Sequence, residues 1–218
     1  MVQSPTYDDI LYPESDGKPI AENTVQYRWI VRLVSNLKRL LKDQTAFVAG
    51  DLLWYPVKVD APPAPSQAPD VMVVLNRPDG DRGSYRQWEE ENIAPQVVFE
   101  IVSPSNTAVE MAEKQAFYQQ HGVLECYVYN PDTDEFWGFV RDRSDQDIMP
   151  IFPLRLPWVS PLLGIRFELF DDGLTVFYPT GEPFQDPGEV MDERDQYKQE
   201  RDRLRAKLRE LGIEPDQL

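Results

Sequence analysis

The residues best suited to chemistry are two carboxylates and a lysine that follow one another along the chain. Glu100 lies inside the apolar run Val97–Val102, which is typical of a strand covered on both faces. A carboxylate in such a strand is costly unless a cation compensates its charge. Asp70 follows Pro69 and opens another apolar run, so it lies at the end of a strand. Lys114 belongs to the helix after Glu100, and its side chain is long enough to reach back along that helix.

Carboxylates on neighbouring strands are suited to bind a hard cation. Mg²⁺ favours one or two carboxylates together with water and phosphate oxygens. The cation then activates water and stabilises charge at a phosphoryl centre, and a nearby lysine adds a point charge. The order Asp70, Glu100, Lys114 is more informative than any one of these residues, and it indicates metal-assisted chemistry on a phosphoryl group.

Each of these residues also has a structural interpretation. The aspartate could cap a turn after its proline. Glu100 could be neutralised by an arginine, such as Arg77 or Arg86. Lys114 could be a solvated helix lysine paired with Glu110 at the preceding turn, which is the simpler interpretation of that residue taken alone. On the sequence these alternatives stay open.

Composition narrows the class of protein. A chain of 218 residues with 41% apolar residues suggests one domain with a core and room for an appendage. The single cysteine, Cys126, excludes an intrachain disulfide, and the lone histidine, His121, excludes a histidine-rich metal site. No apolar run is long enough to span a membrane, and the N-terminus lacks the apolar segment of a signal peptide. We therefore expect a cytoplasmic protein that does not enter a membrane.

The net charge of −16 bears on possible partners. Such acidity argues against tight, non-specific binding to polyphosphate. The charge is uneven, however, because residues 25–42 contain five basic residues and no acidic one. This cationic stretch is either a solvated helix face or a strip that faces phosphates. Any binding of nucleic acid should then be weak and strongly dependent on salt.

Two stretches of the body have the marks of helices that position the candidate residues. Apolar residues at helical spacing predict a helix that begins near Val25 after a cap at Asn23 or Thr24. Thr107 and Glu110 form the T-x-x-E capping box of a second helix, which carries the candidate lysine.

The remaining patterns predict strands, and together with the helices they define an α/β fold. Residues 1–20 and 76–94 are expected to be irregular. The expected strands are a pair at 47–48 and 52–55 that turns near Gly50-Asp51, then 71–75, 97–102, 124–129 and 135–141, the last two as a hairpin, and short strands within 150–180. We expect a mixed central sheet with helices on both faces and a C-terminal helical tail.

The tail differs from the rest of the chain. Apolar residues recur in it at every seventh position, namely Val190, Tyr197, Leu204 and Leu211. The matching second seam is mostly basic, with Arg194, Arg201 and Leu208. A single apolar seam predicts either a solvated helix with charge pairs or a weak coiled coil that helps a homodimer form. We therefore divide the chain into a domain at 1–185 and a helical tail at 186–218.

Several segments resemble a known group of nucleases. They are A-P-D-V-M-V-V at 68–74, V-F-E-I-V-S-P-S at 98–105, E-K-Q-A-F-Y-Q-Q-H-G-V at 113–123, E-C-Y-V-Y-N-P at 125–131 and L-R-E-L-G-I-E-P-D at 208–216. The sequence resembles the PD-(D/E)XK nuclease superfamily, and more narrowly its Uma-type, restriction-endonuclease-like group. The resemblance covers roughly residues 15–180 and the tail, and it implies a restriction-endonuclease-like fold.

The resemblance also implies roles for individual residues. Asp70 and Glu100 would ligate Mg²⁺ or Mn²⁺, and Lys114 would be the catalytic lysine. The usual motif places that lysine two residues after the glutamate, where this chain has Val102. The Uma-type group is thought to supply it from the following helix instead.

A further acidic ligand often comes from the first helix in this superfamily. Glu22, just before the first predicted helix, is the candidate here. Family members often carry a histidine near this helix start, whereas this chain has Gln26 and Tyr27. The departure leaves the role of that position open.

Two functions of different classes follow. The first is a metal-dependent endonuclease that hydrolyses DNA phosphodiester bonds. The alternative is a catalytically silent nuclease-fold module that binds a protein partner, which the acidity and the coiled-coil-like tail favour. A weaker third idea is that the acidic surface mimics the charge of DNA. A nuclease requires Asp70, Glu100 and Lys114 to converge in space.

Overall fold

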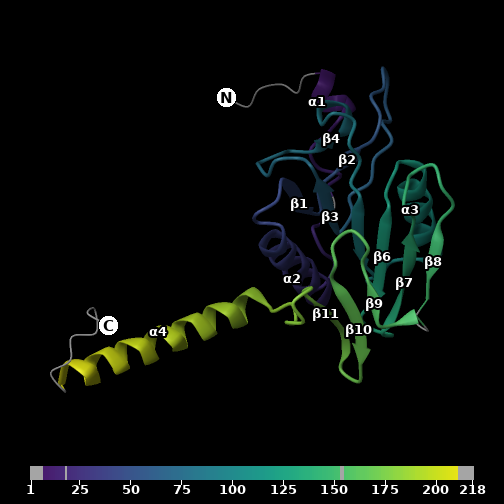
Figure 1. The fold of residues 1–218 in the computed structure, drawn as a ribbon. Helices are drawn as coiled ribbons and strands as arrows, with labels where there is room; N and C mark the ends of the chain where they lie inside the picture. The colour runs from purple at the N-terminus through teal and green to yellow at the C-terminus, as the bar shows by residue number, and fades with distance from the viewer. Residues whose placement is uncertain (1–6, 18, 153–154, 211–218) are drawn as a thin grey trace. The chain divides into compact units, whose positions relative to one another are not determined.

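A computed structural model describes residues 7–17, 19–152 and 155–210 of the chain (Figure 1). The chain divides into two compact units, Met1–Phe184 and Gln185–Leu218. The first unit is a mixed α/β body, and the described part of the second is one long helix. Each unit is described by itself below.

The described elements of the first unit are helices and strands, and the strands predominate after α3. In chain order they are α1 (Tyr7–Leu11), α2 (Thr24–Leu40), β1 (Ala46–Gly50), β2 (Trp54–Tyr55), β3 (Val71–Leu75), β4 (Tyr85–Arg86), the 3₁₀ helix η1 (Gln87–Glu89), β5 (Val97–Ile101), α3 (Ala108–Gln120), β6 (Glu125–Asn130), β7 (Glu135–Val140), β8 (Met149–Ile151), β9 (Trp158–Val159), β10 (Arg166–Phe170) and β11 (Gly173–Phe177).

A six-stranded mixed sheet forms the centre of this unit, in the order β1-β3-β5-β6-β7-β8. Neighbours in the sheet are antiparallel except β5 and β6, which run parallel. A parallel pair needs a crossover connection, and α3 supplies it. The order confirms the predicted mixed sheet and the hairpin of β6 with β7.

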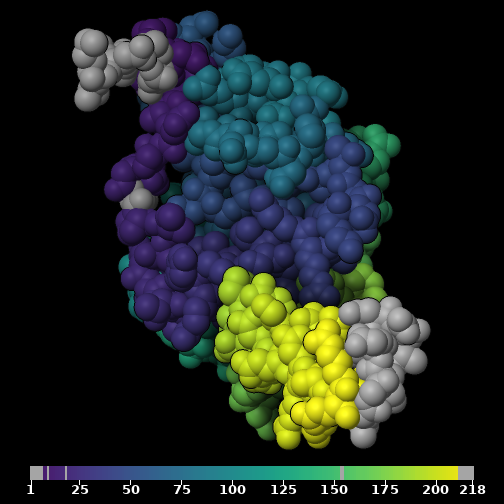
Figure 2. All heavy atoms as spheres, turned by 90° about the vertical axis from the view of Figure 1, so that its left-hand side faces the viewer, coloured from purple at the N-terminus to yellow at the C-terminus, as the bar shows by residue number. Residues whose placement is uncertain are grey.

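Helices cover both faces of this sheet (Figure 1). Successive residues of β5 alternate between two cores: Val97 and Phe99 pack in the core that holds α2, and Val98 packs in the core that holds α3. The small antiparallel sheet β9–β11 adds Phe167 to the α2 side. In Figure 2, purple and blue residues from the N-terminal part of the chain make up most of the face seen there.

The caps that start the two large helices agree with the sequence. Asn23 caps α2, because its side chain accepts hydrogen bonds from the backbone N–H groups of Val25 and Gln26. Thr107 and Glu110 form the capping box at the start of α3, each side chain accepting from the backbone N–H of the other. Both predicted helix starts are therefore confirmed.

The predicted hairpin near Gly50-Asp51 is wrong. β1 pairs with β3, whereas β2 pairs in parallel with β4. The reason is that Asp51, with a φ of 47°, donates its backbone N–H to the carbonyls of Pro69 and Asp70. β1 therefore ends beside the start of β3, and the chain does not turn back to pair β1 with β2.

The expectation of irregular structure needs two further corrections. α1 occupies part of residues 1–20, and β4 with η1 occupies part of 76–94. These short elements pack around aromatic rings, as where Tyr12 contacts Tyr55 and Trp88. Aromatic anchoring of this kind depends on residues far apart in the chain, and local patterning does not show it.

The second unit contains α4 (Pro187–Glu210), which has no buried residue. The three described positions of its apolar seam are exposed, and Leu211 lies outside the described residues. Ion pairs join neighbouring residues, as in Arg194–Asp195 and Arg201–Asp202. The coiled coil and the homodimer stay predictions. In the part of the chain that the structure describes, no helix is long and apolar enough to cross a membrane.

Gly138 in β7 should be essential to the sheet. It lies opposite Tyr127 of β6, and a Cβ atom added to it would collide with the carbonyl oxygen of Cys126. We expect Gly138→Ala to lower the free energy of unfolding by about 1–3 kcal/mol, measured by urea denaturation. Gly188→Ala in α4, where an added Cβ meets no atom within 4 Å, is the control and should not lower it. An unchanged urea midpoint for Gly138→Ala would contradict the packing described.

Candidate active site

Asp70 and Glu100 lie side by side where β3 begins and β5 ends. This edge of the central sheet is formed by strand ends and not by an outer strand. The antiparallel register of β3 with β5 pairs Val71 with Phe99. It therefore places Asp70, which precedes β3, next to Glu100 near the end of β5. The alternation along β5 turns Glu100 toward the face covered by α3.

Two side chains of α3 meet Glu100. Lys114 Nζ lies 2.7 Å from Glu100 Oε2, and the hydroxyl of Tyr118 donates to Glu100 Oε1. Lys114 and Tyr118 share one face of the helix because they are four residues apart. Glu100 is 2% exposed, so this ion pair supplies the compensation that a buried carboxylate requires.

The structure shows which partners these side chains have, and their roles stay predictions. Lys114 pairs with Glu100, and Glu110 serves the capping box. The two arginines considered for Glu100 pair elsewhere, Arg77 with Glu90 and Glu91, and Arg86 with Asp8 and Glu89.

Electrostatics keep both donors to Glu100 protonated. Burial lowers the pKa of Lys114, but the negative charges of Glu100 and Asp70 outweigh burial, and the net shift of the pKa is upward. Burial and the neighbouring Glu100 raise the pKa of the Tyr118 hydroxyl well above its ordinary value. Lys114 therefore remains a cation in the site.

Asp70 accepts a hydrogen bond from the neighbouring strand β5 and does not simply cap the turn after Pro69. Its Oδ2 accepts a hydrogen bond of 2.6 Å from the backbone N–H of Ile101. The amide Nε2 of Gln26 lies 3.3 Å from Oδ2 and 3.4 Å from Oδ1. Burial, followed by the charge of Glu100, raises the pKa of Asp70 to about 7, although Lys114 and these hydrogen bonds oppose the rise.

Asp51 is a third carboxylate at this edge, and sequence reasoning missed it. The register of β1 with β3 pairs Gly50 with Val71, which places Asp51 beside Asp70. Burial, followed by the charge of Asp16, raises the pKa of Asp51 to about 6. The available signal is an aspartate directly after a short apolar strand, a pattern that equally favours a hairpin turn.

A hollow of about 600 Å³ opens over this part of the molecule. Its polar lining comes from the segment before α2, the first turn of α2, the residues around the end of β1 and before the start of β3, the loop before α3, and α3 itself. The residues are Asp16, Glu22, Gln26, Asp51, Asp70, Asn106, Glu110, Glu113 and Lys114, with Gln67. Asp70 and Lys114 thus share one solvent-accessible space.

Glu22 lies at the rim of this hollow and forms hydrogen bonds with the S-P-S segment at residues 103–105. Its Oε2 accepts hydrogen bonds from the hydroxyls of Ser103, at 2.5 Å, and Ser105. Among the described residues, no three His, Cys, Asp or Glu side chains are grouped so that they could hold a metal ion. Any ion at the site would therefore need water or substrate oxygens in addition to the carboxylates.

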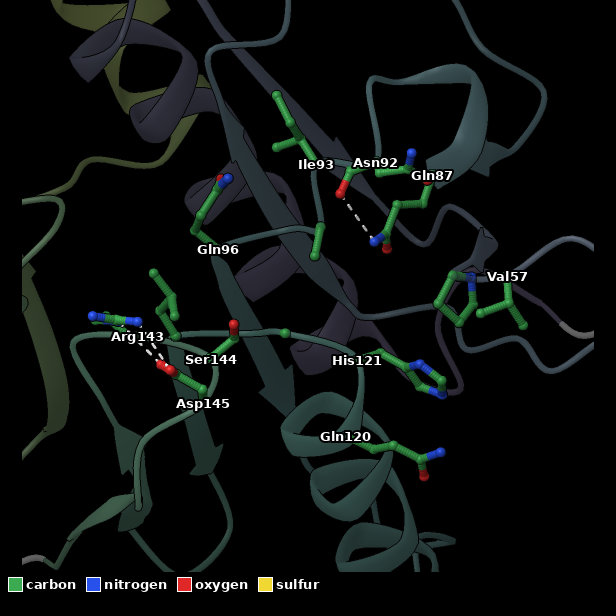
Figure 3. A pocket seen from close by; sticks show the side chains of 14 residues that line it. Val57, Gln87, Asn92, Ile93, Gln96, Gln120, His121, Arg143, Ser144 and Asp145 are labelled. Carbon is green, nitrogen blue, oxygen red and sulfur yellow. Dashed lines mark hydrogen bonds and ion pairs between the residues drawn. The ribbon is translucent and has the colours of Figure 1, made fainter.

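A larger hollow of about 830 Å³ lies at the other end of α3 (Figure 3). One of its polar side chains has a structural role: Gln87 accepts a hydrogen bond from Trp54 Nε1 and donates one to the Asn92 carbonyl. Arg143 and Asp145 pair with each other at its edge. It contains none of the candidate residues, so size alone does not locate the site.

Comparison with known proteins assigns the chain to a restriction-endonuclease-like family. The family model described as "Uma2: Putative restriction endonuclease" matches residues 7–176, and the chain belongs to this family. The resemblance noted in the sequence is thereby confirmed. The solved structures similar to the chain include one titled as a "putative nuclease belonging to DUF820" from Anabaena variabilis ATCC 29413, with 18% identity, a TM-score of 0.45, and coverage of 69% of this chain and 82% of that chain. No curated protein matches the chain.

The pKa of Asp70 predicts how stability changes with pH in the metal-free protein. The pKa of Asp70 in the folded protein, about 7, is above the ordinary 3.8. Between these two pH values the folded protein therefore keeps a proton on Asp70 that the unfolded chain has released. Stability should therefore fall as pH rises from about 4 through 7. Asp70→Asn removes the titrating carboxyl group and with it this loss of stability. Thermal unfolding should therefore show a higher Tm for Asp70→Asn than for wild type at pH 8, but little difference at pH 4.5.

The exposed Asp43, whose side chain is 87% accessible, provides the control. Asp43→Asn should leave the difference in Tm between pH 4.5 and pH 8 as it is in wild type. A lower Tm for Asp70→Asn at pH 8 without metal would contradict the assignment of a costly buried charge.

Proposed function

We propose that this protein is a metal-dependent endonuclease that hydrolyses DNA phosphodiester bonds with Mg²⁺ or Mn²⁺. The observation that supports it best is the convergence of Asp70 and Glu100 on adjacent strands, with Lys114 in contact with Glu100. Membership of a restriction-endonuclease-like family supports the same reaction class. DNA is the proposed partner, and the cytoplasm is the proposed compartment.

The residues present fit a divalent cation. Mg²⁺ takes oxygen ligands and commonly uses one or two carboxylates with water and phosphate oxygens. Asp70 supplies such an oxygen, because in the described residues its Oδ1 has only the 3.4 Å contact with Gln26. Glu100 would be the second ligand. Glu22 would contribute from the rim, after exchanging its serine contacts for the ion or a water.

Each residue then has a defined task. A bound ion would supply positive charge that activates a water molecule and stabilises charge on the phosphoryl group. Lys114 holds a proton on Nζ next to Glu100 and offers a second positive charge to the reacting phosphate. Tyr118 fixes the orientation of Glu100 from the buried side. Asp51 adds negative charge beside Asp70 and so favours a cation at this edge.

One observation favours the catalytically silent alternative. Lys114 and Tyr118 occupy both oxygens of Glu100, so this carboxylate is already compensated without a metal. In that case the acidic body, or the exposed seam of α4, would bind a protein partner. Cleavage assays separate the two functions.

A pair of buried glutamates on the parallel strands β5 and β6 provides a matched test. Glu100→Gln should reduce Mg²⁺- or Mn²⁺-dependent nicking of supercoiled plasmid at least about 100-fold, because it removes a charged ligand. Glu125 is also buried, but it accepts hydrogen bonds from Ser160, Tyr127 and the backbone of Leu162, and in the part of the chain that the structure describes it forms no hydrogen bond with Asp70 or Lys114. Glu125→Gln should keep its nicking activity. If Glu100→Gln nicks as fast as wild type, the metal assignment is wrong; if wild type nicks no DNA with either ion, the silent module is favoured.

Lys114 distinguishes catalysis from metal binding. Lys114→Gln removes the cation that competes for Glu100, so Mn²⁺ should bind at least as tightly as in wild type. The nicking rate should nevertheless fall about 100-fold, because the charge offered to the phosphate is lost. Titration of Mn²⁺ beside single-turnover nicking measures both quantities. The exposed Lys58 provides a control in Lys58→Gln, and nicking at the wild-type rate by Lys114→Gln would rule out a catalytic lysine at this position.

A further inference from the structure

Gln26 has a buried side-chain amide whose oxygen and nitrogen both form hydrogen bonds. It lies in the first turn of α2 and is 7% exposed. Its Oε1 accepts a 2.9 Å hydrogen bond from the backbone N–H of Glu22. Its Nε2 donates a 3.1 Å hydrogen bond to the carbonyl of Ile101 and faces both oxygens of Asp70.

These partners fix which way the amide points. If the amide were turned over, its oxygen would face the Ile101 carbonyl and the Asp70 carboxylate, which are acceptors, and its NH₂ group would face the N–H of Glu22. Three favourable contacts would become repulsive, and a buried polar group without a partner is costly. The donor end of Gln26 is therefore held toward Asp70.

The amide and the backbone together fix the carboxylate of Asp70. The N–H of Ile101 binds Oδ2 from β5, and Nε2 of Gln26 approaches both oxygens from α2. Two donors on two different elements oppose rotation of the carboxylate. Oδ1 keeps only the longer contact, so one oxygen is anchored and the other remains available as a ligand.

The neutrality of Gln26 matters as much as its position. A cationic donor in its place would compensate the charge of Asp70 and compete with a metal ion, as Lys114 does at Glu100. A carboxylate in its place would repel Asp70. A neutral amide orients the aspartate and leaves its negative charge uncompensated, which is the condition that an oxygen ligand for a cation requires.

We propose that Gln26 is a positioning residue of the metal site: it orients Asp70 for the ion and ties the start of α2 to the end of β5. The proposal rests on the proposed function, because it assigns the ion to Asp70. Partners of this kind outside the ligand set change metal affinity when they are removed. Gln26 acts through Asp70, and no contact with substrate is assigned to it.

The first test measures Mn²⁺ binding to the full-length protein without DNA, by the loss of the electron paramagnetic resonance signal of free Mn²⁺. Gln26→Leu should raise the Kd about 10- to 100-fold. Gln26→His should restore most of the affinity, because a neutral imidazole donates from one nitrogen and accepts at the other. An unchanged Kd in Gln26→Leu overturns the proposal.

Asn36 provides a matched control on the same helix. It is a buried amide, 5% exposed, whose Oδ1 accepts from Tyr178 and whose Nδ2 donates to the Arg32 carbonyl. It does not line the hollow. Asn36→Leu should therefore bind Mn²⁺ as wild type does. An equal loss of affinity in Asn36→Leu and Gln26→Leu would assign the effect to general destabilisation and overturn the proposal.

A second measurement needs no metal and separates this proposal from the proposed function. The backbone N–H of Ile101 reports the position of Asp70 directly. In Gln26→Leu its hydrogen exchange, followed by NMR, should accelerate about tenfold, the factor expected from weakening one hydrogen bond, and it should not change in Asn36→Leu. If wild type binds no Mn²⁺, the proposed function fails, and faster exchange at Ile101 still supports Gln26 as the residue that orients Asp70. Unchanged exchange would overturn that orientation as well.

Discussion

The burial of Glu100 is the constraint on which the rest of the site depends. A carboxylate in the centre of a sheet with helices on both faces is costly to bury without a compensating cation. Lys114 provides it, and this requires α3 to begin soon after β5 and to lie on the same face of the sheet. The capping box of Thr107 and Glu110 fixes that beginning. The crossover that joins β5 to β6 thus also delivers the lysine and Tyr118 to the carboxylate.

The antiparallel strands β1 and β3 bring further carboxylates next to Glu100, and one lysine cannot compensate the charge of all of them. β1 ends where β3 begins, and β3 begins where β5 ends, so Asp51, Asp70 and Glu100 come to one edge of the sheet. Burial raises the pKa of both aspartates, followed by the charge of Asp16 at Asp51 and the charge of Glu100 at Asp70. Lys114 alone does not balance these acids, and this supports the proposal that a cation binds at Asp70 and Glu100, although the described carboxylates do not form a ready-made site with three ligands.

The extent to which the sequence predicted this site follows from the range of the interactions. Asp70, Glu100 and Lys114 were recognisable because each belongs to a local pattern, a strand end, an interrupted apolar run and a capped helix. Asp51 and the role of Gln26 depend on pairing of β1 with β3 and on contact of α2 with β5, and these join residues 21 to 75 positions apart. The turn at Gly50-Asp51 was misinterpreted for the same reason: two short strands close in sequence favour a hairpin until longer-range pairing is known.

The two carboxylates at the centre of the site are stabilised in different ways, and the difference assigns them different tasks. Glu100 has a charged partner and a hydroxyl donor, so its charge is balanced within the protein. Asp70 has a backbone N–H and a neutral amide, which orient it without balancing its charge. If a cation binds at this site, Asp70 would be the ligand that gains most from it, because among the described residues its charge has no charged partner in direct contact. Glu100 would hold the ion only in competition with Lys114, which already balances its charge, so the proposed metal site would depend first on Asp70.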